Sequence, residues 1–278
     1  MNEARADFKR MLVRLPHSTH DYAGVGVAAE LAALLGASLV ATFVQDAELV
    51  DLAALPCVRE LRPLGGGWHP IEGPQLLRQL DRAVATARRR FQEAVRSTQI
   101  EASFNVATGA VADVLGTTAD DDDIIVIIEP RNPVERVTQQ FTRFVDAAFG
   151  ASVAVLLVPS RIARTAGPIA AVISGPEDPG LHFALAIAAA AKERVIALAP
   201  VYPNARAAIR GLAEAAGVRL EAGPTIHEPF DVAALLAQLG DLNERLLVMS
   251  RGAVGDRGVA TIASRRGIPV LLARARDR

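Results

Sequence analysis

Cysteine, lysine and tryptophan are scarce in this chain, and each scarcity narrows what the protein can be. The single cysteine, Cys57, excludes an internal disulfide framework and a metal site built from cysteines. Lys9 and Lys192 are the only lysines among 30 basic residues, so arginine carries nearly all of the positive charge. Apolar runs of about 18 residues, the length that spans a bilayer, are also missing. Together with the polar N-terminal segment, these features predict a soluble cytoplasmic protein.

The charge of the chain gives no sign of a polyanionic partner. The formal net charge is −1, so no global field attracts nucleic acid or an anionic membrane. Residues 1–160 carry 15 basic and 20 acidic side chains, whereas residues 161–278 carry 15 basic and 11 acidic ones. The opposite net charges of the two parts favour their mutual attraction, which salt screens. We therefore expect neither nucleic acid nor membrane as a partner.

Short apolar runs rich in β-branched residues alternate with amphipathic segments along the first 160 residues. Runs that are apolar nearly throughout are typical of parallel strands covered on both faces. The expected strands are 11–15, 38–44, 101–107, 124–129 and 153–158. The expected helices are 21–36, 75–98, 110–119 and 136–149. This order predicts an α/β domain.

The same alternation then occurs a second time. The expected strands are 168–174, 194–200, 218–224, 245–250 and 268–273, and the expected helices are 179–192, 204–216, 230–240 and 256–266. Residues 161–168 lack periodicity and contain Gly167-Pro168, which indicates a linker. A repeat of this length indicates a duplicated domain, with domains at 1–160 and 168–278.

The first copy contains an insertion at residues 46–74 that the second copy lacks. It holds a possible short helix at 47–54 and the Gly65–Gly67 loop, followed by Trp68, the only tryptophan. A connection of this length is typical of a lid or of a surface loop. We expect Trp68 to anchor the loop to the domain surface, and a ligand platform is the alternative.

Four local motifs, at 106–115, 122–128, 246–252 and 267–272, resemble those of the universal stress protein family. The run 106–115 is similar to the family's third strand with its glycine and following helix, and 122–128 is similar to its fourth strand. In the second copy, 246–252 resembles the fourth strand leading into the phosphate loop, and 267–272 the approach to the last strand. The resemblance implies two tandem Rossmann-like domains (adenine nucleotide alpha hydrolase-like), each a five-stranded parallel sheet of order 3-2-1-4-5. It also implies that the fifth strands pair across the copies as an internal pseudo-dimer.

The resemblance further implies where a nucleotide would bind. Nucleotide-binding members of the family place an Asp at the end of the first strand, and Gly-x2-Gly-x9-Gly-Ser/Thr after the fourth. Glycines let backbone N–H groups approach phosphates, and a helix N-terminus adds partial positive charge. Here the first-strand position is near Pro16 in one copy and Ser174 in the other, and the first phosphate loop is Glu129–Pro133. Two prolines and an acidic side chain there predict that the first copy does not bind ATP.

The second copy keeps part of the phosphate motif. The candidate binding residues are Ser174, Arg251, Gly252, Gly255 and Gly258. The spacing after Gly255 does not complete the motif, because two residues separate it from Gly258 and eleven separate it from Gly267, where the motif has nine. Two interpretations stay open: a glycine turn between a strand and a helix, or a residual anion or nucleotide site. ATP therefore remains a candidate ligand of the second copy alone.

Other polar clusters do not assemble a catalytic or metal site in the sequence. His17 and His20 lack a third ligand at a suitable spacing, so a solvated or capping loop is favoured. Asp120–Asp123 stands where a strand begins, away from the ligand edge, which predicts a solvated charged turn. Serines at strand ends lack a Gly-x-Ser-x-Gly elbow or a spaced acid and histidine. We expect no catalytic residue and no metal ligand.

Three functions fit these observations. The first is a non-catalytic stress-response or regulatory protein, whose protein partner is unknown and for which a homodimer stays open. The second is a nucleotide-binding protein with weak ATP binding or slow ATPase activity in the second copy. The third is a small-ligand sensor that uses the 46–74 insertion as a lid. The absence of an Asp at either first-strand end favours the first function.

Overall fold

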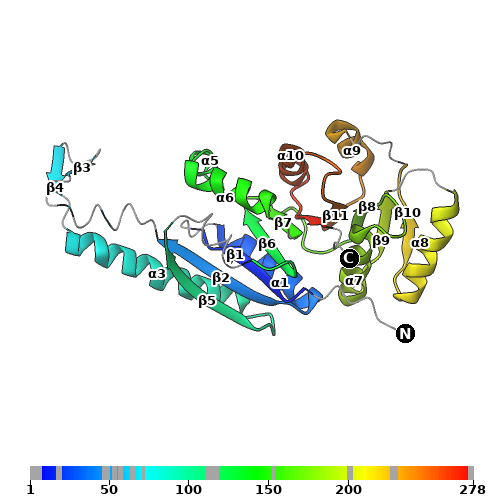
Figure 1. Ribbon diagram of the computed structural model, residues 1–278, viewed down its shortest axis with the longest axis horizontal. Coiled ribbons are helices and arrows are strands. Elements are labelled where there is room, and N and C mark those ends of the chain that lie inside the picture. The colour runs from blue at the N-terminus through cyan, green and yellow to red at the C-terminus, as the bar shows by residue number, and fades with distance from the viewer. Residues whose placement is uncertain are drawn as a thin grey trace.

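A computed structural model describes most of the chain as one α/β fold with helices on both faces of a single sheet (Figure 1). The described residues are 8–16, 21–45, 51, 55, 59–62, 67–70, 73–109, 119–151, 154–198, 203–225 and 231–274. The α/β class expected from the sequence is confirmed. The expected helices at 47–54 and 110–119 fall almost wholly outside the described residues, as do His17 and His20.

The first half of the molecule, residues 8–160, supplies five strands of the main sheet. Its elements are β1 (Arg10–Arg14), α1 (Tyr22–Leu35), β2 (Ser38–Gln45), β3 (Arg59–Arg62), β4 (Gly67–Pro70), α3 (Gly73–Val95), β5 (Ala102–Thr108), β6 (Asp123–Ile128), α5 (Pro133–Arg136), α6 (Gln139–Gly150) and β7 (Ala154–Val158).

The second half, residues 168–274, repeats the plan without the insertion. Its elements are β8 (Ile169–Val172), α7 (Pro179–Ala191), β9 (Val195–Leu198), α8 (Pro203–Ala215), β10 (Leu220–Ala222), α9 (Val232–Leu239), β11 (Leu246–Ser250), α10 (Asp256–Arg266) and β12 (Val270–Ala273).

The ten strands other than β3 and β4 form one continuous sheet in the order β10-β9-β8-β11-β12-β7-β6-β1-β2-β5. Each half has the internal order 3-2-1-4-5, as the resemblance implied. Every pairing within a half is parallel, whereas β7 and β12, the fifth strands, pair antiparallel with Leu156 opposite Leu271. The last strand of each half therefore leaves no open edge at the centre of the molecule.

The core lies in two layers, one on each face of the sheet. On one face, strand residues pack with α1, α3, α7 and α8, and on the other with α6, α9 and α10. The central strands β6, β7, β8 and β12 are buried along their whole length. This two-sided burial explains why their sequences are continuously apolar instead of alternating.

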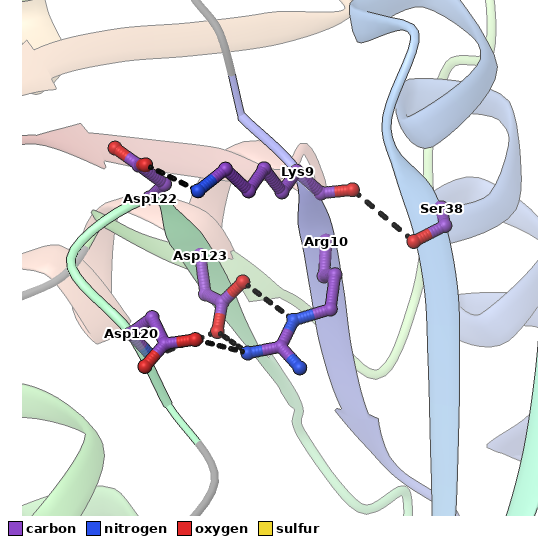
Figure 2. A network of polar contacts seen from close by, with 6 residues as sticks. All are labelled: Lys9, Arg10, Ser38, Asp120, Asp122 and Asp123. Atoms are coloured by element: carbon purple, nitrogen blue, oxygen red, sulfur yellow. Dashed lines mark hydrogen bonds and ion pairs between the residues drawn. The ribbon is translucent and has the colours of Figure 1, made fainter.

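A polar network joins the start of β1 to the start of β6 (Figure 2). The Arg10 guanidinium donates to both carboxylate oxygens of Asp123, at 3.0 and 2.7 Å, and also pairs with Asp120 at 2.9 Å. The Asp123 side chain is fully buried, and its hydrogen bond is the main cause that raises the pKa of Arg10. The expected solvated turn is therefore wrong for Asp123, because Arg10 compensates its charge inside the fold.

Polar contacts also tie the two halves together beyond the paired strands. Arg245, which precedes β11, donates to Glu30 of α1 at 2.6 Å, and Phe8 stacks on Phe183 of α7 with ring centroids 4.6 Å apart. The linker is likewise fixed, since Ala163 N–H donates to the Gly267 carbonyl at 2.7 Å. The halves thus share a strand pairing, an ion pair and an aromatic contact.

The insertion of the first half contains an antiparallel hairpin, β3–β4. Trp68 in β4 is 64% exposed, so the expectation that it anchors the loop to the domain surface is wrong. Figure 1 shows this hairpin at one end of the molecule, beyond α3 and far from β11 and α10. It therefore does not cover the carboxyl edge of the second half.

Candidate functional site

The loops that follow β8 and β11 enclose a cleft at the carboxyl edge of the second half. Its volume is about 860 Å³, within the range of small-molecule sites. The end of β12 forms its floor, with Leu272, Ala273 and Arg274. The first half supplies part of its wall through Phe149 and Gly150, at the C-terminal end of α6.

Asp178 joins the two loops through hydrogen bonds to its side chain. It precedes Pro179 as the N-cap of α7, and its Oδ1 accepts from Gly180 N at 2.8 Å. The same oxygen accepts from the Ser250 hydroxyl at 2.6 Å, while Oδ2 accepts from the Ser174 N–H and hydroxyl at 2.8 and 2.7 Å. Asp178 is buried, so these four donors compensate its removal from water.

Two arginines, Arg251 and Arg274, also line the cleft. Arg251 donates through Nη1 to the Ala151 carbonyl, which caps the end of α6 in the first half. Burial lowers the pKa of Arg251, the neighbouring Arg274 lowers it further, and Asp256 opposes both. Helix α10 begins after Gly255 without a side-chain cap, which leaves amide N–H groups of its first turn for solvent or a ligand.

Four of the five residues proposed from the sequence meet in this cleft. Ser174, Arg251, Gly252 and Gly255 line it, and Gly252 has a φ of +86°, which a turn there requires. Gly258 does not line it. A Cβ at Gly258 would lie 2.8 Å from Val232 Cγ2, so this glycine serves the packing of α10 against α9.

Asp178 is the functional candidate that sequence reasoning missed. In the sequence, Ser174 stands at the end of the first strand of this half, where the family resemblance implies an Asp. The carboxylate comes instead from Asp178, four residues further along the chain, whose side chain accepts a hydrogen bond from Ser174. The sequence does contain a signal, because Asp before Pro is a typical helix start. That the Asp178 side chain reaches back to the end of the strand depends on the path of the loop, which this signal does not give.

The first half differs at the equivalent edge. Glu129 N donates to the Val158 carbonyl just as Arg251 N donates to the Ala273 carbonyl, so Glu129 and Arg251 hold equivalent positions with opposite charge. Glu129 pairs with Arg136 Nη1 at 2.9 Å and accepts from Ser160 N at 3.1 Å.

Arg136 closes this edge of the first half. Its Nε donates to the Pro130 carbonyl at 2.6 Å, and its Nη2 to the Ser160 hydroxyl at 3.0 Å. Asp21, before α1, is the counterpart of Asp178 and accepts from Arg131 N at 3.1 Å. In the described part of this edge, Glu129, Arg136 and Ser160 thus bind one another.

The described ranges also bear on metal binding and on membrane insertion. Within them, no three histidine, cysteine or acidic side chains converge to hold a metal ion. None of the described helices combines the length and apolar character that crossing a membrane requires.

Known structures share this fold, although no family model and no curated protein matches the sequence. A universal stress protein from Archaeoglobus fulgidus DSM 4304 aligns with a TM-score of 0.65 over 97% of this chain and 98% of its own, at 12% identity. A protein of unknown function from Pseudomonas aeruginosa PAO1 aligns with a TM-score of 0.52 over 98% and 95%, at 15% identity. At these identities the likeness establishes the fold and nothing further.

Proposed function

We propose that this chain is a non-catalytic regulatory protein of the universal stress protein type, which binds a small anionic ligand in the cleft of its second half. In this proposal, residues 1–160 and 168–278 are two domains of the type, joined as an internal pseudo-dimer. The pairing of β7 with β12 supports that arrangement. The fold shared with the Archaeoglobus protein supports the type and, by analogy alone, a stress-response role.

The asymmetry between the two carboxyl edges carries the proposal. In the second half the edge is an open cleft lined by Arg251, Gly252 and Gly255. In the first half the equivalent position is Glu129, whose carboxylate is held by Arg136 and Ser160. An anion entering the first half would have to break this network and approach a carboxylate, which supports ligand binding at the second half alone.

The hydrogen bonds of the cleft support binding over catalysis. The hydroxyls of Ser174 and Ser250 both donate to Asp178, which also accepts from two backbone N–H groups. A carboxylate occupied by four donors orders the loops, whereas an activated nucleophile needs a base free to take its proton.

ATP binding in the second half, with slow ATPase activity, is the second candidate. The cleft is large enough for a nucleotide, and α10 starts at its rim. The sensor with a 46–74 lid loses support at this cleft, since the β3–β4 hairpin lies far from β11 and α10 (Figure 1).

Calorimetry with a single glycine variant tests the site. A Cβ at Gly255 meets no atom within 4 Å and its φ is −66°, so Gly255→Val fills the cleft without straining the fold. We expect the parent chain to bind inorganic phosphate and ATP weakly, near millimolar, and Gly255→Val to lose at least tenfold in affinity for both. Gly211→Val, at an exposed position of α8 with equally open surroundings, is the matched control and should bind as the parent does. Unchanged binding by Gly255→Val would place the site elsewhere.

A further inference from the structure

The polar groups of the cleft specify the charge of its ligand. We propose that the cleft takes a ligand that joins one anionic group to hydroxyl or amino donors, and that it discriminates against a polyphosphate such as ATP. The inference rests on the proposed binding role of the cleft and adds the chemical class of the ligand.

The first step is the direction of the serine protons. A serine hydroxyl has one proton, and those of Ser174 and Ser250 are both directed at Asp178, at 2.7 and 2.6 Å. Each hydroxyl oxygen is then left with lone pairs alone, so it accepts hydrogen bonds from a ligand and donates none. Phosphate oxygens are acceptors as well, and they gain nothing from these two side chains. A ligand hydroxyl or amino group does.

The second step is the charge of the lining. The carboxylates of Glu177, Asp178 and Asp256 line the cleft against the guanidinium groups of Arg251 and Arg274. Among the lining residues that the structure describes, the acidic groups thus outnumber the basic ones. Each phosphate that a ligand carries beyond the first adds negative charge beside these carboxylates.

The third step is the contribution of the first half. Helix α6 ends at Gly150 on the cleft wall, and the C-terminal end of a helix carries partial negative charge. Arg251 already donates to the carbonyl of Ala151 there, so part of its donor capacity is committed. The positive charge at Arg251, Arg274 and the first turn of α10 therefore suits a ligand with one anionic group.

Calorimetry of the full chain without Mg²⁺ at pH 7.5 tests the selectivity, with AMP and ATP as probes. The two share adenosine and its hydroxyl and amino donors, while AMP carries one phosphate, of charge about −2. We expect AMP to bind at least tenfold more tightly than ATP, and ribose to bind too weakly to detect because it lacks the anion.

Asp178→Asn identifies the group responsible. Asn serves as a helix N-cap nearly as well as Asp, so its oxygen can still accept from Gly180 N at the start of α7. Its NH2 group replaces Oδ2, so the carboxylate charge and the hydrogen bond from Ser174 N are both lost. The variant should reduce the preference for AMP over ATP at least threefold, through stronger ATP binding. Asp231→Asn makes the same change at the N-cap of α9, where the carboxylate accepts from Ala234 N, away from the cleft. This control should keep the preference of the parent.

The outcomes separate the two claims. If ATP binds the parent as tightly as AMP and Gly255→Val blocks both, the ligand class is overturned while the cleft stands as a binding site. An unchanged preference in Asp178→Asn overturns the ligand class as well. If neither probe binds in a way that Gly255→Val abolishes, both the class and the proposed function fail.

Discussion

Replacing Arg10 by Met should destabilise the fold far more than an exposed ion pair would. The Asp123 carboxylate is 1% exposed, and after the change the Asp120 N–H, at 2.8 Å, is the one donor left to it among the described residues. Removing one partner of a buried pair costs about 3–5 kcal/mol. Because a third of the Arg10 side chain is exposed and water can reach the gap, we expect the lower end, about 3 kcal/mol. With an m-value of about 3 kcal/mol/M in urea, the unfolding midpoint falls by about 1 M.

The neighbouring residue provides the control for this prediction. Lys9 pairs with Asp122 at 3.1 Å, with its own side chain 74% exposed, so Lys9→Met should cost less than about 1 kcal/mol. Urea unfolding followed by far-UV circular dichroism measures both variants. Adding Asp123→Asn to Arg10→Met should recover part of the loss, because the uncompensated charge is then gone. If Arg10→Met costs no more than Lys9→Met, the buried pair does not stabilise the junction of β1 and β6.

Two further predictions concern buried groups. Burial raises the pKa of Tyr22 from 10 to about 12, so the folded state favours the neutral phenol and stability is lost as pH rises from 10 to 12. The phenol oxygen has no hydrogen-bond partner in the described part of the chain, so Tyr22→Phe should match the parent or exceed it by up to about 1 kcal/mol at pH 7. Urea unfolding should also show a smaller loss for Tyr22→Phe between pH 10 and 12, and an identical loss would contradict the assignment. Val155 is fully buried opposite Leu272 where the halves pair, so Val155→Lys should cost about 3 kcal/mol or more and reduce the soluble fraction on expression. Val134→Lys, at a 68% exposed position, should leave that fraction unchanged, and equal yields of the two variants would argue against a buried pairing.

The elements of the fold were predictable because both kinds of local signal are strong here. Continuous apolar runs such as 153–158 occur only where both faces of a strand are covered, and β7 is such a strand. Gly36 ends α1 with a φ of 68°, as its position in the sequence indicated. Strand order came from the family resemblance, since periodicity carries no information about which strands are neighbours.

The candidate site was predictable only in part. The glycines and Arg251 lie next to each other in the sequence, so their convergence follows from one loop. The contributions of Asp178 and of Phe149 depend on how distant segments fold back, which no local pattern encodes. Lys192 shows the same limit for backbone geometry, because it ends α7 with a φ of 56° where glycine would be expected.

The central claim is that one carboxyl edge binds a ligand and the other is closed. A titration of the isotope-labelled full chain with AMP, followed through its backbone amide NMR signals, tests it most directly. Signals of Gly175, Gly252, Gly255 and Asp256 should shift and saturate together, because these residues line the cleft. Signals of Glu129, Arg131 and Asn132 should stay unchanged, since the Glu129 carboxylate in that loop is already bound by Arg136 and Ser160. Saturable shifts in the loop at 129–132, with none at 252–256, would contradict the account.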